Sequence, residues 1–367
     1  MKICLFADAQ SAHIQGLAPG LAARGHDVHV VTHKPAPVRG ATVERFSVPT
    51  VNLLHPRRWQ GRWTHYLRGF LRRFDVVNVH FLHDWGFRLP SEVRENARLI
   101  ATAWGSDIVD PPGETPASPE LVQTRVSLLR HADAVTTCGP TFAATVAEFA
   151  GIGRNAVQIV PFGVDVDLFH PSDDSTRGVK AAGRVGFFKG FREVYGPTYL
   201  IRAILLVLAG RPETRFELVG DGAQRGPCQA LARELGVDAS IEWIPRKRHE
   251  ALPDLLGHWD VSVIPSVHEA FGVAALESSA MGLPVVASDV CGLRDTVRHG
   301  RTGLLVPPRS PQALADAILS LLNDAAWARS LGREGRAMVE REYDWNAIFD
   351  QWATLYARVR EQATVMV

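Results

Sequence analysis

The chain has 367 residues, of which 46% are hydrophobic and 22% charged, a balance typical of a soluble globular protein with room for two domains. Its 40 lysines and arginines face 39 aspartates and glutamates, so no basic excess indicates nucleic acid as a partner. The four cysteines lie far apart, which argues against a disulfide framework or a zinc site and favours a reducing compartment.

The N-terminal residues predict a strand, Lys2–Ala7, in place of a signal peptide, and no apolar run is long enough to span a bilayer. We therefore expect a cytoplasmic protein, with peripheral membrane contact left open.

Short apolar strands alternate with helices through the first half, beginning with a helix at Leu17–Arg24 that Gly25 closes. This alternation predicts a parallel sheet covered by helices on both faces. The predicted strands are Lys2–Ala7, Asp27–Thr32, Val43–Val48, Val76–His80, Leu99–Ala103 and Ala134–Thr137.

Polar residues follow three of these strands, where ligands bind in such sheets. His13 follows the first strand, His83 the fourth, and Trp104 and Asp107 the fifth. Each loop alone fits ordinary turn chemistry, but three on one rim favour a site. The two histidines are the catalytic candidates of this rim. For Asp107, a helix-capping role is at least as good an explanation as a ligand role.

The stretch Leu53–Phe74 combines six arginines with aromatic residues that recur at helical spacing from Trp63 onward. One interpretation is a helix that packs its apolar stripe on the sheet and leaves its arginines in solvent. The other is a basic amphipathic surface for an anionic membrane or acceptor.

A second strand and helix series begins after the polar stretch Asp173–Gly183. We predict domains at residues 1–172 and 173–345, with a last helix at about 346–367 that returns to the first domain. The predicted strands of the second domain are Arg184–Phe188, Arg215–Val219, Ser240–Ile244, Asp260–Ile264, Pro284–Ala287 and Gly303–Val306.

Two turns of this domain are candidates for phosphate binding. Gly220-Asp221-Gly222 is a tight turn between a strand and a helix, and by itself it is weak evidence. Lys189 and Arg192 follow the first strand of the domain, where a cation can meet a diphosphate or simply lie in solvent.

The stretch His268–Glu277 carries the strongest pattern. A buried strand runs through Pro265-Ser266 to a helix that we expect to begin near Phe271 or Gly272 and to end at Gly282. The first-turn amides of such a helix attract an anion, and glycine lets a ligand approach the backbone. Glu269 and Glu277, with seven residues between them, can address two parts of one long ligand.

With these motifs the chain resembles the retaining GT-B fold glycosyltransferases of glycosyltransferase family 4 over nearly its whole length. The most specific match is Glu269 to Glu277, an E-x7-E motif, followed by Gly282-Leu283-Pro284. The resemblance implies an α/β fold in which two Rossmann-like, doubly wound parallel-sheet domains face each other across a cleft.

It also implies transfer of a sugar from a UDP- or GDP-sugar to a hydroxyl of a glycan, a lipid-linked acceptor or a small molecule, without metal or another cofactor. By position, Glu269 hydrogen-bonds the donor sugar and Glu277 binds the ribose. The remaining donor-binding residues implied are Lys189, Arg192, Gly220, Asp221, His268, Ala270, Phe271, Gly272 and Val273.

Three positions depart from the family pattern. Lys189 takes the place of the first of two family cations, but the second place falls on Val194, with Arg192 as the nearby substitute. Ser11-Ala12-His13 replaces paired glycines, and Trp104 stands where many members carry histidine. A nucleotide-sugar epimerase of the same architecture and a two-lobed sugar-binding protein remain alternatives.

Overall fold

The computed structural model describes residues 1–45, 69–82, 97–110, 112, 115–171 and 183–362. Contacts divide the chain into two compact units. Unit 1 comprises Met1–Asp110, Thr115–Phe162 and Trp345–Val367, and unit 2 comprises Pro111–Glu114 and Gly163–Asp344. The predicted division at residues 172/173 lies outside the described residues.

Unit 1 is built on a seven-stranded parallel sheet in the order β3-β2-β1-β4-β5-β6-β7. Its strands carry near-continuous apolar runs because helices cover both faces. The strands are β1 (Lys2–Phe6), β2 (Asp27–Thr32), β3 (Thr42–Arg45), β4 (Val76–His80), β5 (Arg98–Ala103), β6 (Ala134–Thr137) and β7 (Val157–Ile159).

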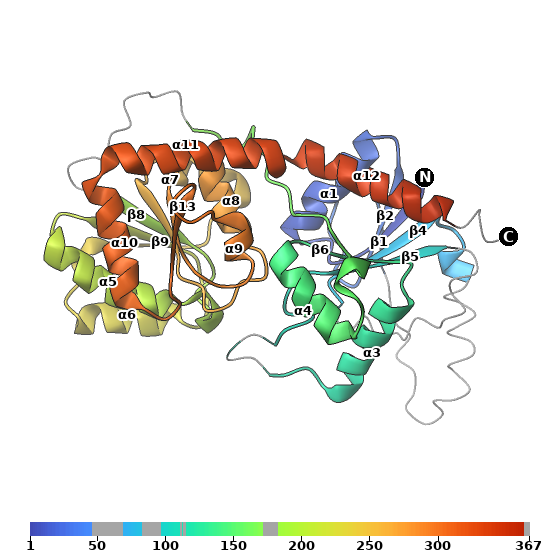
Figure 1. The fold of residues 1–367 in the computed structure, drawn as a ribbon, viewed down its shortest axis with the longest axis horizontal. Coiled ribbons are helices and arrows are strands. Elements are labelled where there is room, and N and C mark those ends of the chain that lie inside the picture. Colours follow the sequence, from blue (N-terminus) through green and yellow to red (C-terminus); the bar gives the residue numbers. More distant parts are fainter. Residues whose placement is uncertain (46–68, 83–96, 111, 113–114, 172–182, 363–367) are drawn as a thin grey trace. The chain divides into compact units, whose positions relative to one another are not determined.

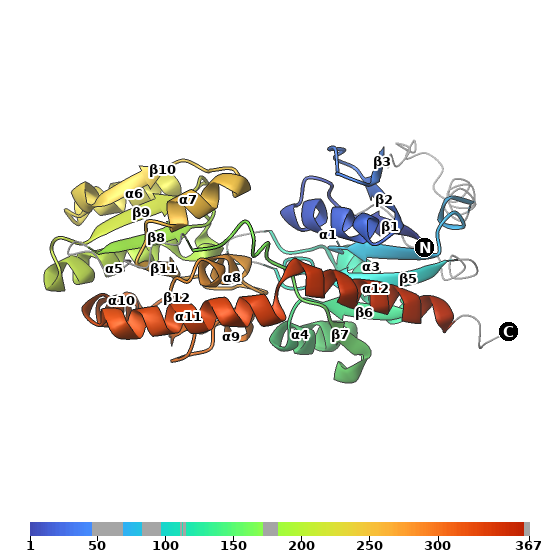
Figure 2. The same cartoon turned by 90° about the horizontal axis from the view of Figure 1, so that it is seen from above.

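The helices of unit 1 include one from the far end of the chain. They are α1 (Ala12–Ala23), α3 (Pro119–His131), α4 (Pro140–Ala150), the short η2 (Arg154–Ala156) and α12 (Trp345–Glu361). Figures 1 and 2 both show α12 beside α1. The ring of Phe349 lies where a Cβ on Gly20 would be, at 2.2 Å, so the glycine permits this close packing. Trp352 and Tyr356 are fully buried in the same core.

Unit 2 repeats the design with six parallel strands in the order β10-β9-β8-β11-β12-β13. The strands are β8 (Arg184–Phe188), β9 (Arg215–Val219), β10 (Ile241–Ile244), β11 (Val261–Ile264), β12 (Val285–Ser288) and β13 (Gly303–Val306). The helices are η3 (Glu193–Tyr195), α5 (Pro197–Gly210), α6 (Arg225–Glu234), η4 (Asp238–Ser240), η5 (His249–Ala251), α7 (Leu252–Leu256), α8 (Val273–Ala280), α9 (Leu293–Thr296), α10 (Pro311–Asn323) and α11 (Ala325–Glu342).

One segment of unit 2, Glu193–Gly210, is long and apolar enough to cross a membrane, with a mean hydropathy of 1.2. This corrects the prediction that no apolar run of the chain is long enough to span a bilayer. In this structure, however, Leu200, Ile201 and Ile204 of α5 are buried in the core of unit 2.

The predicted parallel α/β architecture is confirmed, and most predicted strands agree with the observed ones to within one residue. The first helix begins at Ala12, five residues earlier than predicted, because its opening turn is too polar and too small-residue rich to show an apolar stripe. Between α10 and α11, the carboxylate of Asp324 accepts a hydrogen bond from the amide of Trp327 at 2.9 Å and caps α11.

Candidate functional site

Each sheet reverses its strand order at one place, between β1 and β4 in unit 1 and between β8 and β11 in unit 2. In open parallel sheets the carboxyl ends of the strands beside such a reversal form a crevice in which ligands bind. Most of the predicted site residues that the structure describes lie at these two places, each within its own unit.

The loops at the carboxyl edge of the unit 2 sheet are tied together by backbone contacts. The amide of Phe191, after β8, donates to the carbonyl of Asp221, after β9, at 2.9 Å. The amide of Gly292, after β12, donates to the carbonyl of Glu269, after β11, at 2.9 Å. A Cβ on Gly220 would lie 2.3 Å from the carbonyl oxygen of Lys189, so this glycine permits the contact of two loops. The packing of these two loops alone therefore requires glycine at position 220, whether or not a phosphate binds there.

Lys189 and Glu269 meet at the reversal point. The Lys189 ammonium donates a hydrogen bond to Oε2 of Glu269, and the Ser266 hydroxyl donates to the same oxygen at 3.2 Å. Both charged side chains are largely buried, 12% and 14% exposed. Burial alone would lower the pKa of Lys189, but the carboxylate of Glu269, with smaller effects of Tyr195 and Glu277, raises it. The ammonium is therefore charged and paired.

The helix α8 begins directly beside this pair. Gly272 precedes it with φ of 103° and gives no side-chain cap, so the first-turn amides of Val273 and its neighbours are aimed out of the helix start. A Cβ on Gly272 would lie 2.7 Å from Leu293 and 3.0 Å from Thr296, both on α9. The backbone angle and this packing require glycine here, whether or not a ligand approaches.

The residues between Glu269 and the helix are half-buried or buried. Ala270 is half-buried, and the carbonyl of Phe271 accepts a hydrogen bond from the Thr296 hydroxyl at 3.2 Å. Nε2 of His268 is buried, and burial lowers the pKa of this histidine. His268 is therefore neutral at neutral pH.

Glu277 lies one turn further along α8 and is only 8% exposed. Its Oε1 lies 2.7 Å from Nε2 of His249, at the start of η5 after β10. His249 is not among the predicted site residues, because a lone histidine in the basic run Pro245–His249 carries no signal of this pairing.

The second cation of the predicted diphosphate site is not where the family pattern puts it. Val194 is buried, and its carbonyl accepts a hydrogen bond from the amide of Val267 at 2.8 Å, so its role is structural. Arg192 is exposed, with its guanidinium 5.5 Å from the ring centre of Tyr195. The Lys189 ammonium lies 4.2 Å from the same ring. Tyr195, missed in the sequence analysis, therefore lies against both cations.

Asp221 faces basic partners at the neighbouring loop. Its Oδ1 lies 2.9 Å from the guanidinium of Arg225, and its Oδ2 accepts the amide of Arg246 at 3.0 Å. The side chain is 57% exposed. It organises the turn after β9 and leaves its solvent side open.

An aromatic cluster occupies the reversal point of unit 1. The ring of His13 lies 4.6 Å from that of Trp104 and 4.4 Å from Phe162, and 5.8 Å from the ring of His80. His80, the last residue of β4, is fully buried, and burial lowers its pKa to about 3. Burial, with a smaller effect of His80, also lowers the pKa of His13. Both rings are neutral, and within the described residues their nitrogens have no hydrogen-bond partner.

Asp107 is fully buried and serves the backbone. Its carboxylate accepts hydrogen bonds from the amides of Leu82 at 2.8 Å, Gly105 at 2.7 Å and Trp104 at 3.1 Å. Burial raises its pKa against the opposing effect of these bonds. Within the described residues no helix begins at Asp107, so these bonds tie the loops after β4 and β5 together and do not form a helix cap. A ligand role of Asp107 stays a prediction.

His83 lies outside the described residues, as does most of Leu53–Phe74. In the described end of that stretch, Leu71 and Phe74 are buried in unit 1. Arg73 forms a two-bond ion pair with Glu44, at 2.8 and 3.0 Å. This end packs on the unit, as the first interpretation expects.

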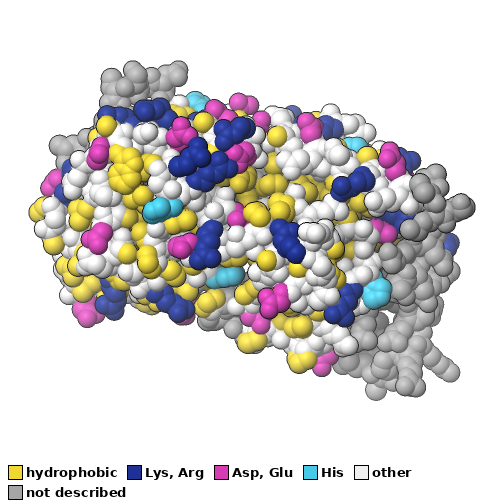
Figure 3. All heavy atoms as spheres, viewed as in Figure 1, with side chains coloured by type: hydrophobic (Ala, Val, Ile, Leu, Met, Phe, Trp, Pro, Cys, Tyr) yellow, Lys and Arg dark blue, Asp and Glu magenta, His cyan; other side chains and the backbone are white. Residues whose placement is uncertain are grey.

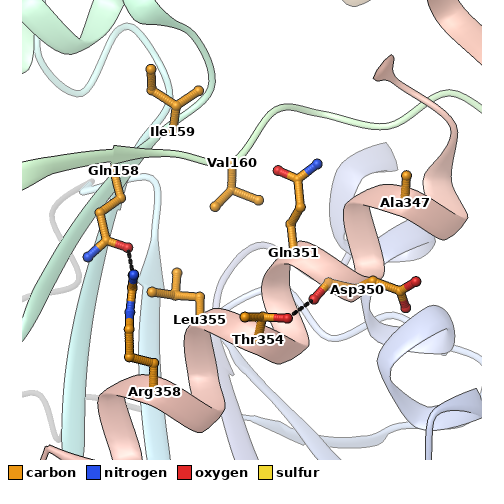
Figure 4. A pocket seen from close by; sticks show the side chains of 9 residues that line it. All are labelled: Gln158, Ile159, Val160, Ala347, Asp350, Gln351, Thr354, Leu355 and Arg358. Atoms are coloured by element: carbon orange, nitrogen blue, oxygen red, sulfur yellow. Dashed lines mark hydrogen bonds between the residues drawn. The ribbon is translucent and has the colours of Figure 1, made fainter. Parts of the chain in front are cut away.

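An open groove of about 490 Å³ runs between β7 and α12 in unit 1 (Figure 4). Four of its polar side chains are already engaged: Arg358 donates to Gln158, Thr354 to the carbonyl of Asp350, and Asp350 pairs with Arg24. None of its lining residues belongs to the predicted site. On the face drawn in Figure 3, acidic and basic side chains are interspersed, in keeping with the net charge of +1.

Two family descriptions match the chain, one in each half. Residues 10–168 match the family described as Glycosyltransferase Family 4, and residues 180–338 match the family described as Glycosyl transferases group 1. The D-inositol 3-phosphate glycosyltransferase of Thermobispora bispora is 27% identical over 396 residues, covering 97% of this chain and 91% of that protein. The protein of the same name from Kribbella flavida is 32% identical over 285 residues, covering 71% and 66%.

Solved structures share the fold over almost the whole chain. Sucrose-phosphate synthase from Thermosynechococcus elongatus superposes with a TM-score of 0.79 at 24% identity, covering 98% of this chain and 99% of that one. The Anabaena protein HepE in complex with UDP gives a TM-score of 0.81 at 20% identity, with coverages of 98% and 100%.

Proposed function

Because the chain is a GT-B glycosyltransferase of the family 4 type, we propose that it transfers a sugar from a nucleotide-sugar to a hydroxyl acceptor with retention at the anomeric carbon. The observation that carries the proposal is the pairing of Lys189 with Glu269 beside the uncapped start of α8. One place thus offers a cation, helix amides and a carboxylate.

The three groups suit the two ends of the bond that breaks. As the bond between the anomeric carbon and the diphosphate oxygen lengthens, positive charge develops on the sugar and negative charge on the leaving group. The Glu269 carboxylate stabilises the first, and Lys189 with the amides around Gly272 and Val273 stabilises the second. The acceptor oxygen then bonds to the anomeric carbon, and its proton passes to the leaving diphosphate. These residues supply the positive charge, so the transfer needs no metal ion.

Glu277 is assigned to the nucleotide ribose. It is buried in the second turn of the same helix, and a carboxylate accepts hydrogen bonds from two neighbouring hydroxyls. The UDP held by the Anabaena neighbour supports a nucleoside diphosphate as the donor moiety. Lys189 and Arg192, lying against Tyr195, are then the diphosphate cations, and His268, Ala270, Phe271, Gly220 and Asp221 complete the donor site.

The acceptor side is assigned to His13 and Trp104 in unit 1. Their rings offer stacking surface, and the neutral nitrogens of His13 offer a hydrogen-bond acceptor for a hydroxyl proton. The relatives named for D-inositol 3-phosphate make this compound the first acceptor to test.

The deciding experiment measures nucleotide release from UDP- and GDP-sugars with and without D-inositol 3-phosphate and a panel of hydroxyl acceptors. A transferase releases nucleotide rapidly only when an acceptor is present, and the product anomer reports retention. An epimerase converts the donor alone, and a binding protein does neither. The Glu269→Gln variant should lose at least about 100-fold in transfer rate, and EDTA should leave the wild-type rate unchanged. Full activity of Glu269→Gln would refute the proposed role of the Glu269 carboxylate in stabilising positive charge on the sugar.

A further inference from the structure

We infer that His249 is a positioning residue of the donor site, which orients Glu277 toward the nucleotide ribose and couples donor affinity to protonation of the imidazole. This inference rests on the proposed function, because it takes Glu277 as the carboxylate that binds the ribose. His249 does not itself need to touch the sugar or the diphosphate.

The contact is direct and leaves half of the carboxylate available. Nε2 of His249 lies 2.7 Å from Oε1 of Glu277. Oε2 accepts no hydrogen bond from any residue that the structure describes. A hydrogen bond at one oxygen restricts the rotation of a carboxylate, and the second oxygen is then held in a preferred direction. His249 therefore sets the direction from which a hydroxyl pair is received.

The imidazole is held in turn from behind. Its ring lies 5.0 Å from that of Phe169, which is fully buried. Arg336 of α11 donates to the carbonyl of Phe169 and, at 2.8 Å, to the carbonyl of Ala280 at the end of α8. One guanidinium thus fixes both the ring behind His249 and the helix that carries Glu277. The arrangement is built into the unit, because all of these residues belong to unit 2.

The surroundings of the ring favour its charged form. The hydrogen bond that the ring donates to Glu277 raises the pKa of His249 against the opposing effect of burial, and the carboxylates of Glu250 and Asp165 add to the increase. The Lys189 ammonium also interacts electrostatically with Glu277. Because a charged donor holds a carboxylate more firmly than a neutral one, the orientation of Glu277 weakens as the pH rises through the pKa of His249. The negative diphosphate of the donor further favours the imidazolium, so donor binding and proton binding reinforce each other.

The test measures dissociation constants of UDP-glucose and GDP-mannose by calorimetry from pH 5.5 to 8.5 for the wild type, His249→Gln and His249→Ala. In both probes the diphosphate is esterified at both ends and does not titrate in this range, so a pH effect reports the protein. The probe that binds more tightly is then compared with its 2′-deoxyribose analogue. Glutamine keeps an N–H donor near the place of Nε2 but does not titrate.

In the wild type, affinity should fall about 3- to 5-fold with rising pH, and removal of the 2′-hydroxyl should cost about 10-fold. His249→Gln should keep the 2′-hydroxyl preference but lose the pH dependence. His249→Ala should lose both and bind about 5- to 10-fold more weakly at pH 6. If the wild type binds neither probe, the proposed function fails. If it binds but all three proteins share one pH profile and one 2′-hydroxyl preference, the role of His249 alone is refuted. A circular dichroism spectrum that matches that of the wild type shows that each variant is folded.

Discussion

Lys189 and Glu269, 80 residues apart in sequence, form an ion pair across the neighbouring strands β8 and β11 at the reversal point of the unit 2 sheet. Both side chains are largely buried. Lys189→Met should therefore destabilise the protein by about 1–3 kcal/mol, because it leaves the Glu269 charge buried without its cation. Urea unfolding measures the loss.

The matched control is the double variant Lys189→Met with Glu269→Gln, which removes both charges. It should recover at least half of the stability that Lys189→Met loses. If the double variant is less stable than the single one by the full additive amount, the pair contributes no coupling.

Gly272→Ala should destabilise unit 2 by about 2–4 kcal/mol, since it combines a backbone φ of 103° with a Cβ 2.7 Å from Leu293. Gly226→Ala is the control, because Gly226 lies in the first turn of α6 with nothing within 4 Å of the added methyl. It should change stability by less than about 1 kcal/mol, in the stabilising direction. Equal thermal midpoints for the two variants would contradict the strain at Gly272.

Acid should destabilise unit 1 through its buried histidines. An unfolded histidine binds a proton near pH 6.5, whereas folded His80 does so only near pH 3. The unfolded chain therefore holds the extra proton between these values, and stability is full above about pH 6.5 and falls as the pH drops toward 3.

The variant His80→Met removes this titration while filling a similar volume. Between pH 8 and pH 5, the free energy of unfolding of this variant should fall by about 2 kcal/mol less than that of the wild type. Chemical denaturation at the two pH values measures the difference. His258→Met, at an exposed position, should follow the wild-type curve.

Tyr195 should matter through its ring and not through its hydroxyl. Tyr195→Phe keeps the aromatic face against Lys189 and Arg192, so donor affinity should stay within about 2-fold of the wild type. Tyr195→Ala removes that face and should weaken binding of UDP-glucose about 3- to 10-fold. Equal affinities of the two variants would show that the ring does not hold the cations.

The sequence predicted the sheet architecture well because buried parallel strands read as short apolar runs, as Val76–His80 and Arg184–Phe188 illustrate. It also predicted Glu269 and Lys189 at one edge, since both directly follow strands. The partners of these residues were not predictable in the same way. β10 lies at the edge of the sheet, with β9 and β8 between it and β11, and His249 of η5 nevertheless meets Glu277 of α8, a contact that no local pattern records.

His80 was missed for a related reason. It ends an apolar strand, where a buried neutral histidine looks like any other strand residue, whereas the predicted His83 lies outside the described residues. For Asp107 the local pattern left a ligand role and a capping role open, and the three backbone amides that its carboxylate accepts come from loops that only the fold brings together.

The helix α12 has a consequence for the order in which the chain becomes folded. Its buried face, with Trp352 and Tyr356, closes the core of unit 1 against α1, yet it follows the whole of unit 2 in the sequence. Almost all of unit 2 is continuous in sequence and is synthesised before this helix. Synthesis of unit 1 therefore begins before that of unit 2 and is completed after it. A chain stopped before Trp345 exposes the apolar face of α1.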